Sequence, residues 1–246
     1  MSPSDEPLAP QAPGPVVFIA CRVLQDMLER LLPQSLEARV IWMDYGLHRV
    51  PVKMTAALQE AIDSLETPSL VVLGYGLCGN GLAGLRAGPH TLLMPRTDDC
   101  IALLLGSHRA YMREFEANPG TYYLTKGWLE AGSNPLQEYE ALEPKYGAKE
   151  AMWLMDQQYQ NYRRLALVAH SQADLDQYRP QAQAVAQFCQ RWGMAYAEIL
   201  GSEDYVRRVV EATRALASGQ PLPGALRPDF VIVRPGGEIQ PLAFMR

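Results

Sequence analysis

The sequence lacks a long hydrophobic run and lacks an N-terminal basic region followed by an apolar one. The longest apolar runs, such as CIALLLGS at 100–107 and RLALVAH at 164–170, are far shorter than the roughly 20 residues that cross a bilayer. These absences argue against a transmembrane helix and a secretion signal. We therefore expect a cytoplasmic protein with no membrane partner.

An excess of positive charge is also missing. Lys and Arg number 22 against 27 Asp and Glu, which gives a formal net charge of −5 and a pI near 5.4. This balance argues against a nucleic-acid partner. Hydrophobic residues make up 48% and charged residues 20%, as in ordinary globular proteins, and 246 residues are enough to bury a core.

Several catalytic and binding motifs are absent. The chain has no Walker loop, no dinucleotide fingerprint, no HExxH zinc helix and no support for a serine triad. It has only four cysteines and four histidines. In a protein without a secretion signal, disulfides are not expected, so the four cysteines are read as free thiols.

The apolar pattern predicts an α/β protein with a parallel or mostly parallel sheet flanked by helices. Residues 1–15 carry five prolines and no periodic pattern, and we read them as a disordered tail. Strands are predicted at 16–21, 38–46, 69–76, 163–170, 194–202 and 229–237. Helices are predicted near 23–32, 52–65, 99–117, 174–192 and 203–217.

This rhythm suggests an N-terminal α/β lobe at 16–130 and a C-terminal α/β lobe at 131–246. Two similar lobes and one continuous sheet both fit the pattern, because no internal repeat decides between them. The role of the second half, including His170, stays open.

Three of the four cysteines follow predicted strands. Cys21 ends the first strand, and Cys78 lies in the glycine-rich GYGLCGNG after the third. Cys100 follows MPRTDD after a further strand that begins at TLL, between the strands predicted at 69–76 and 163–170. Because ligands of open parallel sheets bind beyond the carboxyl ends of the strands, we expect these thiols to converge there. Each cysteine alone is more typical of a core side chain, as we expect for Cys189, but the shared position of the trio favours ligation.

Three thiolates suit zinc, cuprous copper or an iron-sulfur cluster, and three ligands leave one position open for substrate. The paired CxxC spacing of structural zinc sites is absent. We favour a [4Fe-4S] cluster with one open iron. Zinc remains the alternative cofactor.

Polar residues near the same strand ends are candidates for catalysis. Tyr45 and His48 follow the second strand and suit proton transfer, and Arg96 suits an anionic group of a small-molecule substrate. Asp99 is a candidate at the site, although a helix cap is the usual role of such an aspartate. His48 and Arg96 also have plain structural alternatives, in backbone capping and in pairing with an aspartate. The aromatic stretch PGTYYLTKGW at 119–128 either walls a pocket or serves packing.

Four segments carry a resemblance to a known family: DYGLHRVP, LGYGLCGNGLAGL, PRTDDCIALLLGS and NPGTYYLTKGW. The chain resembles the domain of unknown function family 1638, clearly over residues 16–130. Asp98 stands where the family pattern Arg-Ala-His-Asp-Cys has its histidine. Because members often occur beside corrinoid-dependent methyltransferase systems, the resemblance implies metal or one-carbon chemistry and a corrinoid methyltransferase protein as a partner.

Two classes of function fit these residues. The first is an enzyme with an open cluster iron and an anionic or sulfur-containing substrate, of the lyase or sulfur-transfer type. Its zinc variant catalyses methyl transfer or hydrolysis. The second is a non-enzymatic carrier of a metal or cluster, or an accessory protein for corrinoid methyltransferases, which uses the same three thiolates.

Overall fold

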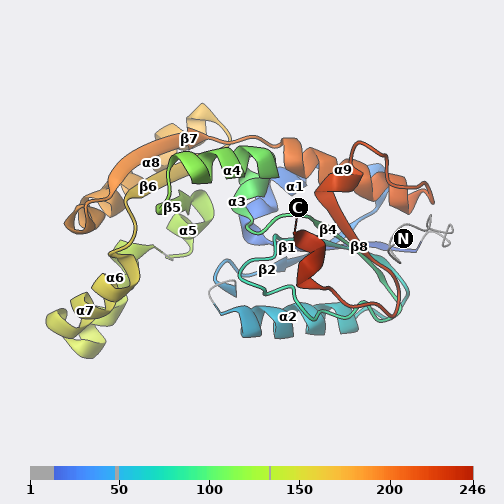
Figure 1. The fold of residues 1–246 in the computed structure, drawn as a ribbon, viewed down its shortest axis with the longest axis horizontal. Helices are drawn as coiled ribbons and strands as arrows, with labels where there is room; N and C mark the ends of the chain where they lie inside the picture. Colours follow the sequence, from blue (N-terminus) through green and yellow to red (C-terminus); the bar gives the residue numbers. More distant parts are fainter. Residues whose placement is uncertain (1–13, 48–49, 133, 246) are drawn as a thin grey trace. The chain divides into compact units, whose positions relative to one another are not determined.

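The computed structural model describes residues 14–47, 50–132 and 134–245. The protein is of the predicted α/β class, with helices packed on parallel or mostly parallel sheets. The chain forms two compact units (Figure 1). Unit 1 comprises the described residues up to Leu103 and from Asp204 onward, and unit 2 comprises Leu104–Glu203.

A five-stranded sheet forms the centre of unit 1, in the order β2-β1-β3-β4-β8. The first four strands of that order run parallel to one another, and β8 runs antiparallel to β4. Both β1 and β3 are buried along their whole length, as expected for strands covered on both faces. The strands are β1 Val16–Cys21, β2 Arg39–Met43, β3 Leu70–Gly74, β4 Thr91–Pro95 and β8 Phe230–Val233.

Helices cover both faces of this sheet (Figure 1). The helices α1 (Gln25–Leu31) and α9 (Asp204–Ala217) contact each other, and α9 also packs on β3 and β4. On the opposite face lies α2 (Pro51–Asp63), which begins with proline at its first position and buries Met54, Leu58 and Ile62 at a spacing of one turn. Short 3₁₀ turns lie at η1 Arg22–Leu24, η2 Gln34–Leu36, η5 Arg227–Asp229 and η6 Pro241–Phe244.

The strand order contains a topological switch point. From β1 the chain passes to β2 on one side, and β3 then pairs with β1 on its other side. In doubly wound sheets the region beyond the carboxyl ends of two such strands is where ligands bind. A ligand site is therefore expected beyond the ends of β1 and β3.

A smaller sheet lies in unit 2, with three parallel strands in the order β5-β6-β7. Its core includes Cys189, which is fully buried, together with a group of packed aromatic rings. Tyr122 belongs to that group, in contact with Trp128, Tyr159 and Tyr162. The strands are β5 Thr121–Thr125, β6 Arg164–Ala169 and β7 Ala195–Leu200. The helices are α4 His108–Ala117, α5 Lys126–Glu130, α6 Pro135–Tyr146, α7 Ala148–Tyr159, α8 Gln172–Cys189 and η4 Gln190–Trp192, and α3 (Ile101–Leu104) leads into the unit.

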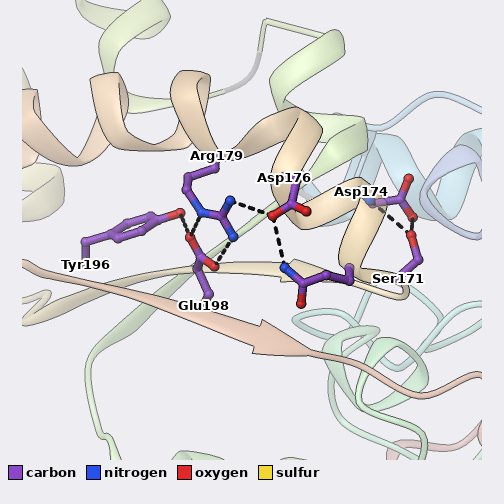
Figure 2. A network of polar contacts seen from close by, with 7 residues as sticks. Ser171, Asp174, Asp176, Arg179, Tyr196 and Glu198 are labelled. Atoms are coloured by element: carbon purple, nitrogen blue, oxygen red, sulfur yellow. Dashed lines mark hydrogen bonds and ion pairs between the residues drawn. The ribbon is translucent and has the colours of Figure 1, made fainter.

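A polar network joins α8 to the edge strand β7 (Figure 2). The Arg179 guanidinium donates to both carboxylate oxygens of Glu198, at 2.7 and 2.8 Å, and to Asp176 at 2.6 Å. Tyr196 donates its hydroxyl proton to Glu198 at 2.9 Å. Ser171 caps the start of α8 by accepting a hydrogen bond from the Asp174 amide. These contacts hold α8 against β7, the edge strand of the three-stranded sheet.

One local prediction differs from the structure, and one open alternative is decided by it. The single helix predicted near 99–117 is two helices, α3 and α4, because Gly106 has a φ of +87° and Ser107 caps a new helix by accepting from the Ala110 amide at 3.0 Å. The stretch 119–128, for which a pocket wall and packing were both left open, contains the strand β5, and its aromatic residue Tyr122 packs against the core of unit 2.

The two compact units are also divided differently from the expected lobes 16–130 and 131–246. The last part of the chain returns to unit 1, because β8 pairs with β4 and α9 packs on the same sheet. Residues 104–130 belong to unit 2, because β5 pairs with β6. Within the described ranges, no helix is long and apolar enough to cross a membrane.

Candidate metal centre

The three cysteines that follow strands all lie in unit 1, at the ends of adjacent strands. Cys21 is the last residue of β1, Cys78 lies in the turn after β3, and Cys100 lies between β4 and α3. Because β1, β3 and β4 are parallel neighbours in the sheet, these three positions lie at one edge of it. The three cysteines therefore lie at the carboxyl ends of the strands, on the side of the sheet where the switch point is.

Backbone pairing continues beyond the ends of β3 and β4 and draws their loops together. The Leu77 amide donates to the Thr97 carbonyl at 2.8 Å, and the Cys78 amide donates to the Asp98 carbonyl at 2.9 Å. Gly76 makes this approach possible, because a Cβ atom there would lie 2.7 Å from the backbone carbon of Asp99. The glycine therefore has a steric role in bringing Cys78 beside Cys100.

The three thiols are buried and interact with one another. The exposed fractions are 5% for Cys21 and 8% for both Cys78 and Cys100. A hydrogen bond to Cys78 raises the pKa of Cys100 above its ordinary value, and burial adds to the effect. Burial raises the pKa of Cys21 to about 12, with a smaller rise from Cys78, against the lowering effect of the Val23 amide. The pKa of Cys100 therefore depends on both other thiols, and the pKa of Cys21 depends on Cys78.

The turn that carries Cys78 has an unusual backbone. Cys78, Gly79 and Asn80 have φ values of +47°, +63° and +70°, so three consecutive residues are left-handed. A side chain in this region costs about 1–2 kcal/mol, and such residues concentrate at functional sites. The turn is held by the Gly81 amide, which donates to the Cys78 carbonyl at 3.2 Å, and by Thr55 of α2, whose hydroxyl donates to the Gly81 carbonyl at 2.9 Å.

A tyrosine that the sequence analysis did not single out lies beside the three thiols. Tyr75 is 2% exposed, and its buried hydroxyl has no hydrogen-bond partner among the described residues. Burial raises the pKa of this hydroxyl, and Cys21, Cys78 and Cys100 each raise it further. The available sequence signal was a tyrosine between two glycines at the end of a buried strand.

Three of the predicted catalytic residues, Asp99, Arg96 and Tyr45, lie in the described part of unit 1. The Asp99 carboxylate accepts a hydrogen bond from the Ile101 amide at 2.9 Å, so it caps the turn into α3. The Arg96 guanidinium donates to the Met245 carbonyl, and the Arg96 amide donates to the Asp229 carbonyl at 2.7 Å. Tyr45 is half-buried in the turn after β2, and His48 lies outside the described residues.

Residues of unit 2 have structural contacts of their own. Cys189 is fully buried at the end of α8, as expected for a core cysteine. His170 follows β6, and its Nε2 atom lies 2.9 Å from the Leu104 carbonyl oxygen.

Across residues 14–47, 50–132 and 134–245, no group of three or more His, Cys, Asp or Glu side chains is arranged around a single metal ion. In a cubane cluster each thiolate binds a separate iron, so the three thiols need not surround one ion. Three soft sulfur donors with a buried hydroxyl beside them match the chemistry of a cluster.

Comparisons with known proteins identify the family. No match was found among curated proteins or among solved structures. The family described as "Protein of unknown function (DUF1638)" matches residues 42–210, a range that includes Tyr75, Cys78 and Cys100 and begins after Cys21. This match covers more than half of the chain. The protein therefore belongs to the DUF1638 family.

Proposed function

We propose that this protein is a metalloenzyme in which Cys21, Cys78 and Cys100 bind a [4Fe-4S] cluster with one iron left open for substrate. The observation that carries the proposal is the meeting of three thiols from three neighbouring strands at the switch point of the sheet. Thiolates are the usual protein ligands of such clusters, and a set of three leaves one iron without a protein ligand.

The strained turn supports a ligand role for Cys78. A cysteine that serves only packing does not need a left-handed backbone, which lowers stability. A cysteine that binds a cofactor must lie at one particular position, so a strained backbone is retained there. Burial of all three thiols supports an enzyme more than a carrier, because a carrier must release its metal readily to a partner. The alternative role, as an accessory protein to corrinoid methyltransferases, rests on the family resemblance alone.

The bound cluster would supply a Lewis-acidic iron or a sulfur acceptor for a small anionic or sulfur-containing substrate. The protein's own residues would hold the cluster, exclude water and move protons. We keep Tyr45 and His48 as the proposed proton carriers. We assign Arg96 to the C-terminal segment, because its guanidinium donates to the Met245 carbonyl.

Chemical reconstitution tests the proposal. The metal-free chain is incubated without oxygen with ferrous iron and sulfide, and the bound iron and the absorbance near about 400 nm are measured after desalting. The wild-type chain should take up a cluster, and Cys78→Ser should lose tight binding while it remains folded. Cys189→Ser is the matched control, since it removes a buried cysteine from unit 2, and it should bind as the wild type does.

The same preparations distinguish a cluster from zinc. A colourless wild-type chain that holds about one zinc per molecule, lost in Cys78→Ser, would replace the cluster with a zinc-thiolate site. Full iron binding by Cys78→Ser would contradict the three-cysteine site itself.

A further inference from the structure

We infer that the Tyr75 hydroxyl donates a hydrogen bond to the group that the three cysteines bind, at a cluster sulfide or a cysteine thiolate. The inference rests on the proposed cluster site and adds a positioning residue to it. It follows from the surroundings of one side chain, compared with those of the other buried tyrosines.

Among the described residues, the other tyrosines that are less than 9% exposed all have acceptors for their hydroxyls. Tyr205 donates to the Asp229 carbonyl at 2.9 Å, Tyr159 donates to Glu138, and Tyr178 donates to Glu130. Tyr75 is as deeply buried as these residues, yet its hydroxyl has no acceptor among the described residues. A buried hydroxyl without a partner destabilises the folded protein. The simplest explanation for a tyrosine at position 75 is therefore that its hydroxyl has an acceptor in a bound group.

The backbone on either side of Tyr75 is closely packed. A Cβ atom at Gly74 would lie 2.6 Å from the Ala20 side chain, and one at Gly76 would lie 2.7 Å from the backbone carbon of Asp99. Tyr75 is therefore held between the end of β1 and the loop after β4. These two segments carry Cys21 and Cys100, and the hydroxyl interacts electrostatically with both thiols and with Cys78.

A neutral donor at this position has a definite chemical effect. Hydrogen bonds to the sulfurs of a cluster help to set its reduction potential. The reduced cluster carries one more negative charge, so a donor stabilises it more than the oxidised form and raises the potential. Tyr75 would supply this donor without adding a charged group to a buried site.

Tyr75→Phe tests the inference, with Tyr205→Phe as the matched control in the same unit. In the metal-free chain, Tyr75→Phe should raise the Tm by about 2–4 °C, because it removes an unpaired buried hydroxyl. Tyr205→Phe should lower the Tm, because it removes a hydrogen bond that the structure contains.

After reconstitution, Tyr75→Phe should hold as much iron and sulfide as the wild type but have a lower midpoint potential, by about 59 mV for each tenfold loss in the reduction equilibrium. Equal potentials with equal iron would overturn the role of Tyr75 and leave the cluster site standing. A wild-type chain that binds no iron would overturn the proposed function, and the inference with it.

Discussion

The thiols of Cys78 and Cys100 share a hydrogen bond, although one follows β3 and the other follows β4. The contact exists because the two loops continue the backbone pairing of their strands, with Gly76 against the backbone of Asp99. Cys21 reaches the same place from β1. The arrangement of the three thiols is therefore set by the sheet itself.

Gly76→Ala should disturb this arrangement. The added Cβ would meet the Asp99 backbone at 2.7 Å, so the two loops must separate, and we expect a loss of about 1–3 kcal/mol in the free energy of unfolding. Gly224→Ala is the control, because nothing lies within 4 Å of its Cβ position and the change should stay within about 1 kcal/mol. Urea unfolding of both variants measures the difference. Equal stability of the two variants would show that the close approach at Gly76 is unimportant.

Two substitutions of Cys78 should differ in their effect on the stability of the metal-free chain, although both should abolish cluster binding. Cys78→Gly relieves the left-handed backbone at φ +47°, whereas Cys78→Ala retains the strain, so the glycine variant should be more stable than the alanine variant by about 1 kcal/mol. Both variants should fail to bind a cluster. Thermal unfolding of the metal-free chains gives the comparison, and a less stable glycine variant would mean that the turn is not strained at Cys78.

His90 should make stability depend on pH. The side chain is 1% exposed, its Nδ1 accepts from the Ser69 amide at 3.2 Å, and burial lowers its pKa below the ordinary value. Below about pH 6.5 the unfolded chain binds a proton that the folded chain resists, so the free energy of unfolding should fall as the pH falls from about 7 to 5.

His90→Asn keeps an acceptor for the Ser69 amide but cannot take up that proton. The decrease toward low pH should therefore be smaller in this variant than in the wild type, with the other histidines unchanged as an internal control. Identical slopes in the two proteins would exclude His90 as their source.

Arg179→Lys should weaken the contact between α8 and β7 in unit 2. Lysine keeps the charge but cannot donate to both carboxylate oxygens of Glu198, as the guanidinium does in Figure 2. Because the side chains are partly exposed, we expect a small loss of stability that shrinks at high salt. A double-mutant cycle with Glu198→Gln measures the coupling, and independent effects of the two substitutions would contradict a direct contact.

The sequence pattern predicted the strands that matter for the site. A buried apolar run specifies a strand by itself, so the positions of Cys21, Cys78 and Cys100 after strands followed directly. The division of the chain into units did not follow, because it depends on β8 pairing with β4 from the far end of the sequence. Nothing in the local pattern of 230–233 indicates that partner.

Within the site, the side chains were harder to predict than the thiols. The role of Tyr75 could be inferred only from the structure, because its hydroxyl is buried with no acceptor in the part of the chain that the structure describes. Asp99 was predicted both as a site residue and as a helix cap, and its contact with the Ile101 amide supports the cap. Arg96 was expected near a substrate anion, but the contact with Met245 depends on where the C-terminal segment folds back.

The most direct test of the three-cysteine site is the metal and acid-labile sulfide content of the full chain, purified without oxygen and without any added metal. We predict a brown protein with about four irons and as many sulfides per chain. In Cys21→Ser, Cys78→Ser and Cys100→Ser that content should be lost, while Cys189→Ser keeps it. A wild-type protein without metal, or three serine variants with undiminished iron, would contradict the account.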